Sequence, residues 1–106
     1  MNVTSELDAR MEIRAFIDRS RAPYTDWYVG VTADPDARIA AHGLQESDWY
    51  IVRRLAGAEA AQRVAEALLK LECDGSATET VSEGEEAPAG PATSVYAYWK
   101  RGHTTP

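Results

Sequence analysis

The stretch from Asp34 to Gly43 carries the clearest local signals in the sequence, because the residues at its two ends suit the boundaries of a helix. Asp34 is a favoured N-cap residue, and Pro35 suits the first helical position, where its missing N–H costs no hydrogen bond. Gly43 suits the left-handed conformation that ends many helices. The sequence therefore predicts a short helix over residues 35–42.

Three segments are predicted to form strands, because β-branched and aromatic residues are frequent in them. These segments are residues 26–32, 48–55 and 94–100. Side chains alternate between the two faces of a strand, so Tyr28 and Gly30 are expected to share one face of the first strand. For the same reason, Tyr96 and Tyr98 are expected to share one face of the last strand.

Two further helices are predicted from apolar residues that recur every three or four positions. Ser5 is the expected N-cap of the first, over residues 6–21. The stripe that this helix is expected to bury consists of Leu7, Met11, Phe16 and Ile17. The other helix follows the second strand and ends by residue 71. Its expected buried stripe consists of Ala61, Val64, Ala65, Leu68 and Leu71.

The length of 106 residues suits one domain with a single hydrophobic core. The predicted elements indicate an α+β fold in which helices cover a small three-stranded sheet. The expected parts are an N-terminal helical segment (1–25), a core (26–72), an acidic Gly/Pro-rich loop (73–94) and a C-terminal strand (95–101).

Several classes of protein are disfavoured by what the sequence lacks. No apolar run approaches the roughly 18 residues that cross a bilayer, and no basic and then apolar order marks a secretory signal, so a cytoplasmic protein without a membrane partner is expected. Cys73 is the only cysteine, which excludes an internal disulfide and a cysteine-cluster metal site. The three tryptophans fall in predicted strands and are expected to pack in the core or on the sheet, with a platform for stacking bases as the alternative.

The charge balance bears on possible partners. Seventeen acidic and eleven basic side chains give a formal charge of −6, the wrong sign for a domain that binds nucleic acid mainly through phosphates. Part of the excess is local, because six carboxylates and no lysine or arginine lie in residues 72–93. The rest of the chain is close to neutral, so a basic face elsewhere is compatible with the composition.

The segment WYVGVTADPDARIAAH, residues 27–42, resembles the second half of the GIY-YIG nuclease signature. In that signature a Tyr-x-Gly strand ends in Thr, and a short helix presents Arg, often with a His one turn later. The downstream AAQRVAEALLKL is similar to the helix that carries a metal-binding Glu in active members, and the CDG after it resembles a glycine turn of related small proteins. The resemblance covers residues 27–75 and implies a GIY-YIG-like fold with an altered N-terminus.

The resemblance also implies a role for each matching residue in phosphodiester cleavage. Tyr28 would orient water, Arg38 would neutralise phosphate, and His42 would assist proton transfer. Gly30 and Thr32 would be binding residues, Gly30 because it lets a ligand approach the strand. A Mg²⁺ ion held by a carboxylate would polarise the phosphate.

Structural interpretations of the same residues stay open beside these roles. Tyr28 is also suited to cross-strand packing, and Arg38 to a solvated helix face. His42 is favourably placed at a helix C-terminus, where the helix dipole stabilises a positive charge. Gly30 also fits a bulge or a close helix crossing.

Two departures from the family pattern count against catalysis. The segment before Trp27 is helical in pattern and holds no Gly-Ile-Tyr strand, so Tyr96 or Tyr98 of the last strand is the expected substitute. The family's metal-binding Glu falls at Ala65, which has no carboxylate. The neighbouring Glu66 is expected to face water, so no divalent ion is expected near Tyr28 and Arg38.

These departures and the acidic charge predict a degenerate GIY-YIG-like domain that no longer cuts and instead binds a macromolecule, either a nucleic acid or a protein. No cofactor is expected for such a domain. The alternative is a Mg²⁺-dependent DNA endonuclease that uses Tyr28, Arg38, His42 and Glu66. A third interpretation is an acidic mimic of nucleic acid, which predicts carboxylates spaced along a rigid surface.

Overall fold

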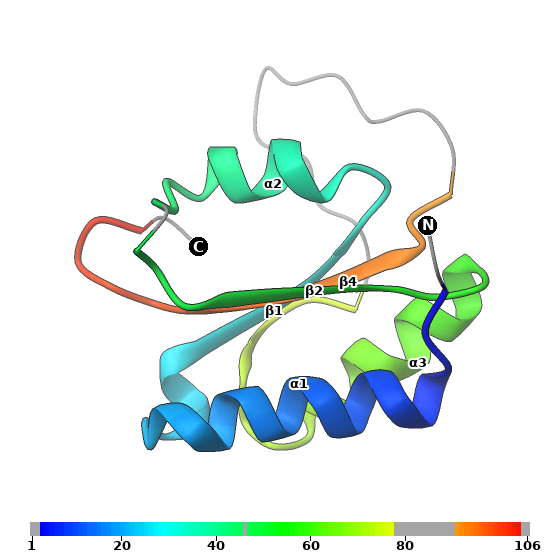
Figure 1. The fold of residues 1–106 in the computed structure, drawn as a ribbon, viewed down its shortest axis with the longest axis horizontal. Coiled ribbons are helices and arrows are strands. Elements are labelled where there is room, and N and C mark those ends of the chain that lie inside the picture. Colours follow the sequence, from blue (N-terminus) through cyan, green and yellow to red (C-terminus); the bar gives the residue numbers. More distant parts are fainter. Residues whose placement is uncertain (1–2, 46, 78–90, 105–106) are drawn as a thin grey trace.

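The computed structural model describes residues 3–45, 47–77 and 91–104 and has helices on both faces of one sheet (Figure 1). This arrangement confirms the predicted α+β class. In chain order the elements are α1 (Glu6–Ser20), a short 3-10 turn η1 (Tyr24–Asp26), β1 (Trp27–Thr32), α2 (Pro35–Ala41), β2 (Tyr50–Arg54), α3 (Ala58–Leu69), β3 (Asp74–Gly75) and β4 (Ser94–Trp99). Much of the predicted acidic loop, including Glu79, Glu83, Glu85 and Glu86, lies outside the described residues.

The sheet has four strands in the order β2-β4-β1-β3, so the prediction of three strands was wrong. β4 is antiparallel to both β1 and β2, whereas β3 is parallel to β1. β3 has only two residues, too few for any alternating pattern to mark it in the sequence. It exists because the chain after α3 returns to β1, where the Ser76 N–H donates to the Val29 carbonyl at 3.0 Å.

The local helix signals are confirmed by hydrogen bonds. The Ser5 hydroxyl accepts from the Asp8 N–H at 3.2 Å, and the Asp34 carboxylate accepts from the Ala37 N–H at 3.2 Å. Gly43 has the positive φ of 78° that its position after the helix predicts. α2 ends one residue earlier than expected, so that His42 occupies the C-cap position.

The main core lies between the sheet and the helices α1 and α3, which Figure 1 shows below the sheet. The sheet contributes Trp27, Val29, Val31, Val95 and Ala97 to it. α3 contributes Ala60, Ala61, Val64, Ala65 and Leu68, which confirms most of its predicted stripe. Leu71 follows the end of α3 and is only half-buried. The alanines of α3 are small, so the helix backbone lies close to the strands.

The predicted buried stripe of α1 was largely wrong. Leu7 and Met11 are 57% and 59% exposed, whereas Ala9, Ile13 and Ile17 are fully buried. At about 100° per residue, positions two apart lie on opposite sides of a helix, so burying Ala9 turns Leu7 and Met11 outward. The small Ala9 gave little apolar signal, yet it starts the row, spaced by four residues, along which α1 meets the core.

Ion pairs join α1 to its neighbours at the surface. Arg63 of α3 donates to both carboxylate oxygens of Glu6, at 2.7 and 2.9 Å, and Arg53 of β2 donates to Glu12 at 2.7 Å. Exposed pairs of this kind contribute little stability, about 0 to 1 kcal/mol each, so burial of the apolar row holds α1 in place. None of the helices within the described ranges is long and apolar enough to cross a membrane.

We predict that Ala65→Glu destabilises the protein by about 3 to 5 kcal/mol, because it puts a carboxylate without a partner into the apolar layer between α3 and the sheet. Urea unfolding measures the change. Glu66→Ala is the matched control on the exposed side of α3 and is expected to change stability by less than about 0.5 kcal/mol. Equal stability of the two variants would contradict the packing of α3 described above.

Candidate functional site

The aromatic site residues gather on the α2 face of the sheet. Pairing of β4 with β1 sets Tyr96 opposite Gly30 and Tyr98 opposite Tyr28. Side chains at these positions point to the same face, away from α1 and α3. The predictions that the last strand pairs with residues 27–32, and that Tyr96 and Tyr98 face the same way as Tyr28, are therefore confirmed.

His42 joins the tyrosines from the end of α2. Its Nε2 lies 2.9 Å from the hydroxyl oxygen of Tyr96, and its Nδ1 lies 3.2 Å from that of Tyr98. A neutral imidazole has one donor and one acceptor nitrogen, so one phenol donates to the ring and the other accepts from it. The ring of Tyr28 lies 5.0 Å from that of His42 and stacks on Tyr98 at 5.3 Å. We call Tyr28, His42, Tyr96 and Tyr98 the tyrosine–histidine cluster.

Gly30 makes room for this cluster. A Cβ atom at Gly30 would collide with the hydroxyl and ring carbons of Tyr96, which lies across the strand at that point. The space that the resemblance assigns to an approaching ligand is therefore filled by a side chain of the protein itself.

Two polar residues complete the α2 face beside the cluster. Thr32 is fully buried, and its hydroxyl accepts from the Asp34 N–H at 3.0 Å, which turns the chain from β1 into α2. Arg38 of α2 is only 6% exposed, and its positive charge acts to lower the pKa of Tyr98. α2 thus brings Arg38 and His42, one turn apart, to the phenols of β1 and β4.

Burial governs the protonation of the site. Removal from water raises the pKa of Tyr98 well above the ordinary phenol value, and the neighbouring Tyr28 and Tyr96 raise it further, against the smaller opposing effect of Arg38. Tyr98 is therefore a neutral phenol at physiological pH. Burial likewise raises the pKa of the Cys73 thiol to about 11, so this thiol is not an activated nucleophile.

The cluster is closed to solvent. Tyr28 is 9% exposed, and His42, Tyr96 and Tyr98 are 2% exposed or less. Leu44 and Val52 pack against the tyrosines and also line a groove of about 620 Å³ between α2 and β2. The reactive groups thus lie behind apolar side chains, and a phosphodiester outside would not touch the imidazole or the phenols in this conformation.

The carboxylates of α3 lie on the other side of the sheet. Glu66 is exposed and accepts from the Gln62 side chain at 3.0 Å, and Ala65 is buried against the strands, as predicted. Because α3 covers the face opposite to α2, Glu66 does not meet the tyrosine–histidine cluster (Figure 1). Among the residues that the structure describes, no three His, Cys, Asp or Glu side chains gather closely enough to hold a metal ion.

A second group of aromatic side chains lies around the start of β2. Trp49 is 40% exposed and Tyr50 38% exposed, so Trp49 lies on the sheet and not in the core. The ring of Trp49 lies 5.4 Å from Phe16 and 6.2 Å from Trp99. The position of Trp49 just before an edge strand is the signal that indicates partial exposure.

Arginines flank both ends of this aromatic group. The Arg19 guanidinium lies over the ring of Phe16 at 5.6 Å, and that of Arg101 lies over Trp99 at 4.8 Å. Within the described ranges neither arginine forms an ion pair. We call this region the β2 surface; it consists of Phe16, Arg19, Trp49, Tyr50, Trp99 and Arg101.

Comparisons with known proteins found no match. No family model matches the sequence, and neither a curated protein nor a solved structure matches the chain. Functional conclusions therefore depend on the sequence and on the geometry of the site.

We predict that Tyr96→Phe lowers the free energy of unfolding by about 1 to 3 kcal/mol, because it leaves a buried nitrogen of His42 without its phenol. Tyr50→Phe is the control, since the Tyr50 ring is partly exposed and lies outside the cluster. Chemical unfolding of both variants gives the difference. If Tyr96→Phe were as stable as Tyr50→Phe, the His42–Tyr96 bond would not support the fold.

Proposed function

We propose that this protein is a degenerate GIY-YIG-like domain that binds a macromolecule and does not cleave it. The observation that carries this proposal is the closed tyrosine–histidine cluster. Cleavage of a phosphodiester needs a phenol or imidazole and a metal-binding carboxylate to converge on the phosphate. Here the phenols and the imidazole are buried, and Glu66 lies across the sheet from them.

The cluster is suited to a structural role in such a domain. It holds the end of α2 to β4 through the two His42 bonds, and it fills the space above Gly30. The residues that resemble a nuclease signature then serve the fold, because they pack and bond together. A binding surface elsewhere on the molecule needs this rigid frame but does not need the phenols and the imidazole to take part in cleavage.

The β2 surface is the binding surface that we favour, with single-stranded nucleic acid as its partner. Aromatic rings that are partly exposed offer stacking to bases, at about 1 to 3 kcal/mol per base, without selecting a sequence. Arg19 and Arg101 at the two ends are suited to phosphates. The excess of negative charge is concentrated after residue 71, so this surface does not have to share the sign of the whole chain.

The alternative function is a Mg²⁺-dependent DNA endonuclease. The observation that favours it is that Tyr28, Arg38, His42 and Tyr96, which come from three separate elements, lie on one face of the sheet. This function requires α2 to move away from the sheet and a metal-binding carboxylate from outside the cluster.

An assay on plasmid DNA separates the two functions. We predict no nicking or linearisation with Mg²⁺ or Mn²⁺ present, because the phenols and the imidazole cannot reach a phosphate. Arg38→Ala serves as the control for a contaminating nuclease. Cleavage by the unaltered protein that disappears in Arg38→Ala would overturn the non-catalytic proposal.

The β2 surface is tested by fluorescence anisotropy with a labelled single-stranded oligonucleotide. We predict that Trp49→Ala weakens binding about tenfold through lost stacking, and that Arg19→Glu with Arg101→Glu weakens it further and reduces its salt dependence. Leu7→Ala is the control, since it removes an exposed apolar side chain outside the β2 surface.

Two outcomes would contradict this choice of surface and partner. Binding that is unchanged in Trp49→Ala would place the nucleic acid elsewhere on the molecule. No binding at low salt would remove nucleic acid as the partner and leave a protein as the macromolecule that the domain binds.

A further inference from the structure

α1 has apolar side chains on two faces, and only one of them belongs to the core. Ala9, Ile13 and Ile17 are buried against α3 and the sheet. Leu7 and Met11 lie one turn apart on the outer side and are more than half exposed. Large exposed apolar residues that cluster next to a groove mark interaction sites more often than single exposed ones do.

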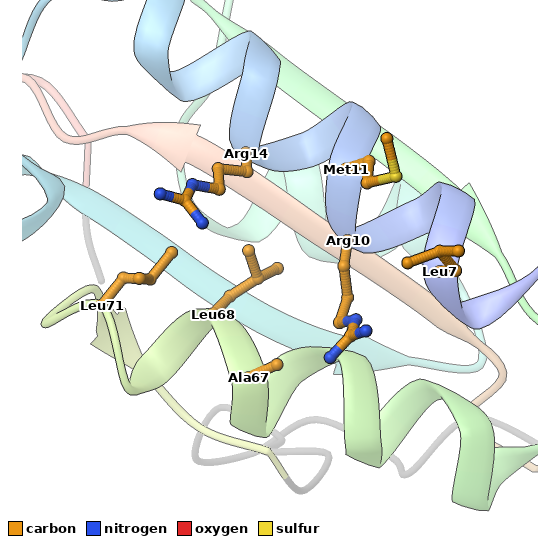
Figure 2. A pocket seen from close by; sticks show the side chains of 7 residues that line it. All are labelled: Leu7, Arg10, Met11, Arg14, Ala67, Leu68 and Leu71. Carbon is orange, nitrogen blue, oxygen red and sulfur yellow. The ribbon is translucent and has the colours of Figure 1, made fainter.

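A groove lies between these residues and α3 (Figure 2). Its volume is about 280 Å³, and its apolar lining consists of Leu7, Met11, Ala67, Leu68 and Leu71. Sites for small organic ligands usually enclose about 300 to 1,000 Å³ and bury most of the ligand. This open groove is smaller than those sites and suits one or two apolar side chains inserted by a larger partner.

Two arginines indicate that a partner in the groove carries negative charge. Arg10 and Arg14 line the groove from α1, one turn apart. Figure 2 shows the Arg10 side chain reaching toward α3 and the Arg14 side chain extending along the groove on the side of Leu71. Neither guanidinium has an ion pair within the part of the chain that the structure describes. Glu6, whose charge interacts with that of Arg10, already accepts two hydrogen bonds from Arg63. Arg14 also hydrogen-bonds the Tyr24 side chain, which acts to lower the pKa of Tyr24, but this phenol does not neutralise the charge. Both positive charges can therefore still pair with carboxylates of another molecule.

We propose that the α1–α3 groove binds an acidic amphipathic helix of a partner protein. Apolar side chains spaced three or four residues apart on that helix enter the groove between Met11 and Leu68. Carboxylates one turn apart on the same helix pair with Arg10 and Arg14, because residues at i and i+4 lie at matching intervals on two helices that run side by side. The net charge of −6 disfavours a second copy of this chain as the occupant.

Selection from a display library of helical peptides tests this proposal. The expected result is enrichment of sequences with apolar residues at i and i+3 or i+4 and with Asp or Glu beside them. Binding of a selected peptide, measured by fluorescence anisotropy, should fall at least about tenfold in Arg10→Glu with Arg14→Glu and in Leu7→Ser with Met11→Ser. Exchange of the carboxylates of the peptide for lysines should restore its binding to the charge-reversed variant.

The matched control is Arg21→Glu with Arg101→Glu, which changes the net charge by the same amount outside the groove and should leave peptide binding unchanged. All of these side chains are on the surface, and circular dichroism verifies that each variant is folded. Failure to enrich any sequence, or peptides that bind all variants equally, would overturn the proposal. Self-association that the Leu7 and Met11 changes abolish would also overturn it, since the occupant would then be a second copy.

Discussion

The antiparallel pairing of β1 with β4 is the interaction on which the rest of the structure depends. It runs from Trp27 opposite Trp99 to Thr32 opposite Ser94. It brings β4, the last strand in chain order, into the middle of the sheet. β2 pairs only with β4, and β3 pairs only with β1. Without this pairing β2 and β3 would not belong to one sheet. Neither helical layer would then have a continuous surface to cover.

The register of this pairing puts the apolar side chains of β1 and β4 on one face of the sheet and their tyrosines on the other. The valines of β1 and β4 and Ala97 point to α1 and α3, whereas the three tyrosines of the cluster point to α2. A slip by one residue would exchange these faces, and the contact of Tyr96 with Gly30 prevents it, because no larger residue fits beneath that ring. The same geometry keeps Glu66, on the far side of the sheet, away from the phenols.

Structural features that depend on neighbouring residues in the sequence were the ones that could be predicted. The caps at Ser5 and Asp34 and the turn at Gly43 depend on neighbouring residues, and each was predictable. The strand faces followed from alternation, so the grouping of Tyr28, Tyr96 and Tyr98 was predictable as soon as β4 was expected beside β1.

Features that depend on tertiary contacts were harder to predict. Which face of α1 is buried is decided by Ala9, a residue too small to mark a stripe, and two residues give β3 no pattern of their own. Closure of the cluster is a property of packing by Leu44 and Val52, which no motif records. The exposure of Trp49 likewise depends on the open edge of β2.

The tyrosine–histidine cluster is closed to water, and the ionisation of Tyr98 reports on this closure. Carbon-13 NMR of tyrosine labelled at Cζ follows each phenol as the pH rises, with folding monitored in the same samples. We expect the Tyr98 signal to stay at its protonated position through pH 10, where an exposed phenol is half ionised, because burial raises the pKa of Tyr98. Ionisation of Tyr98 near pH 10 in the folded protein would contradict the account and would indicate a site open to water and substrate.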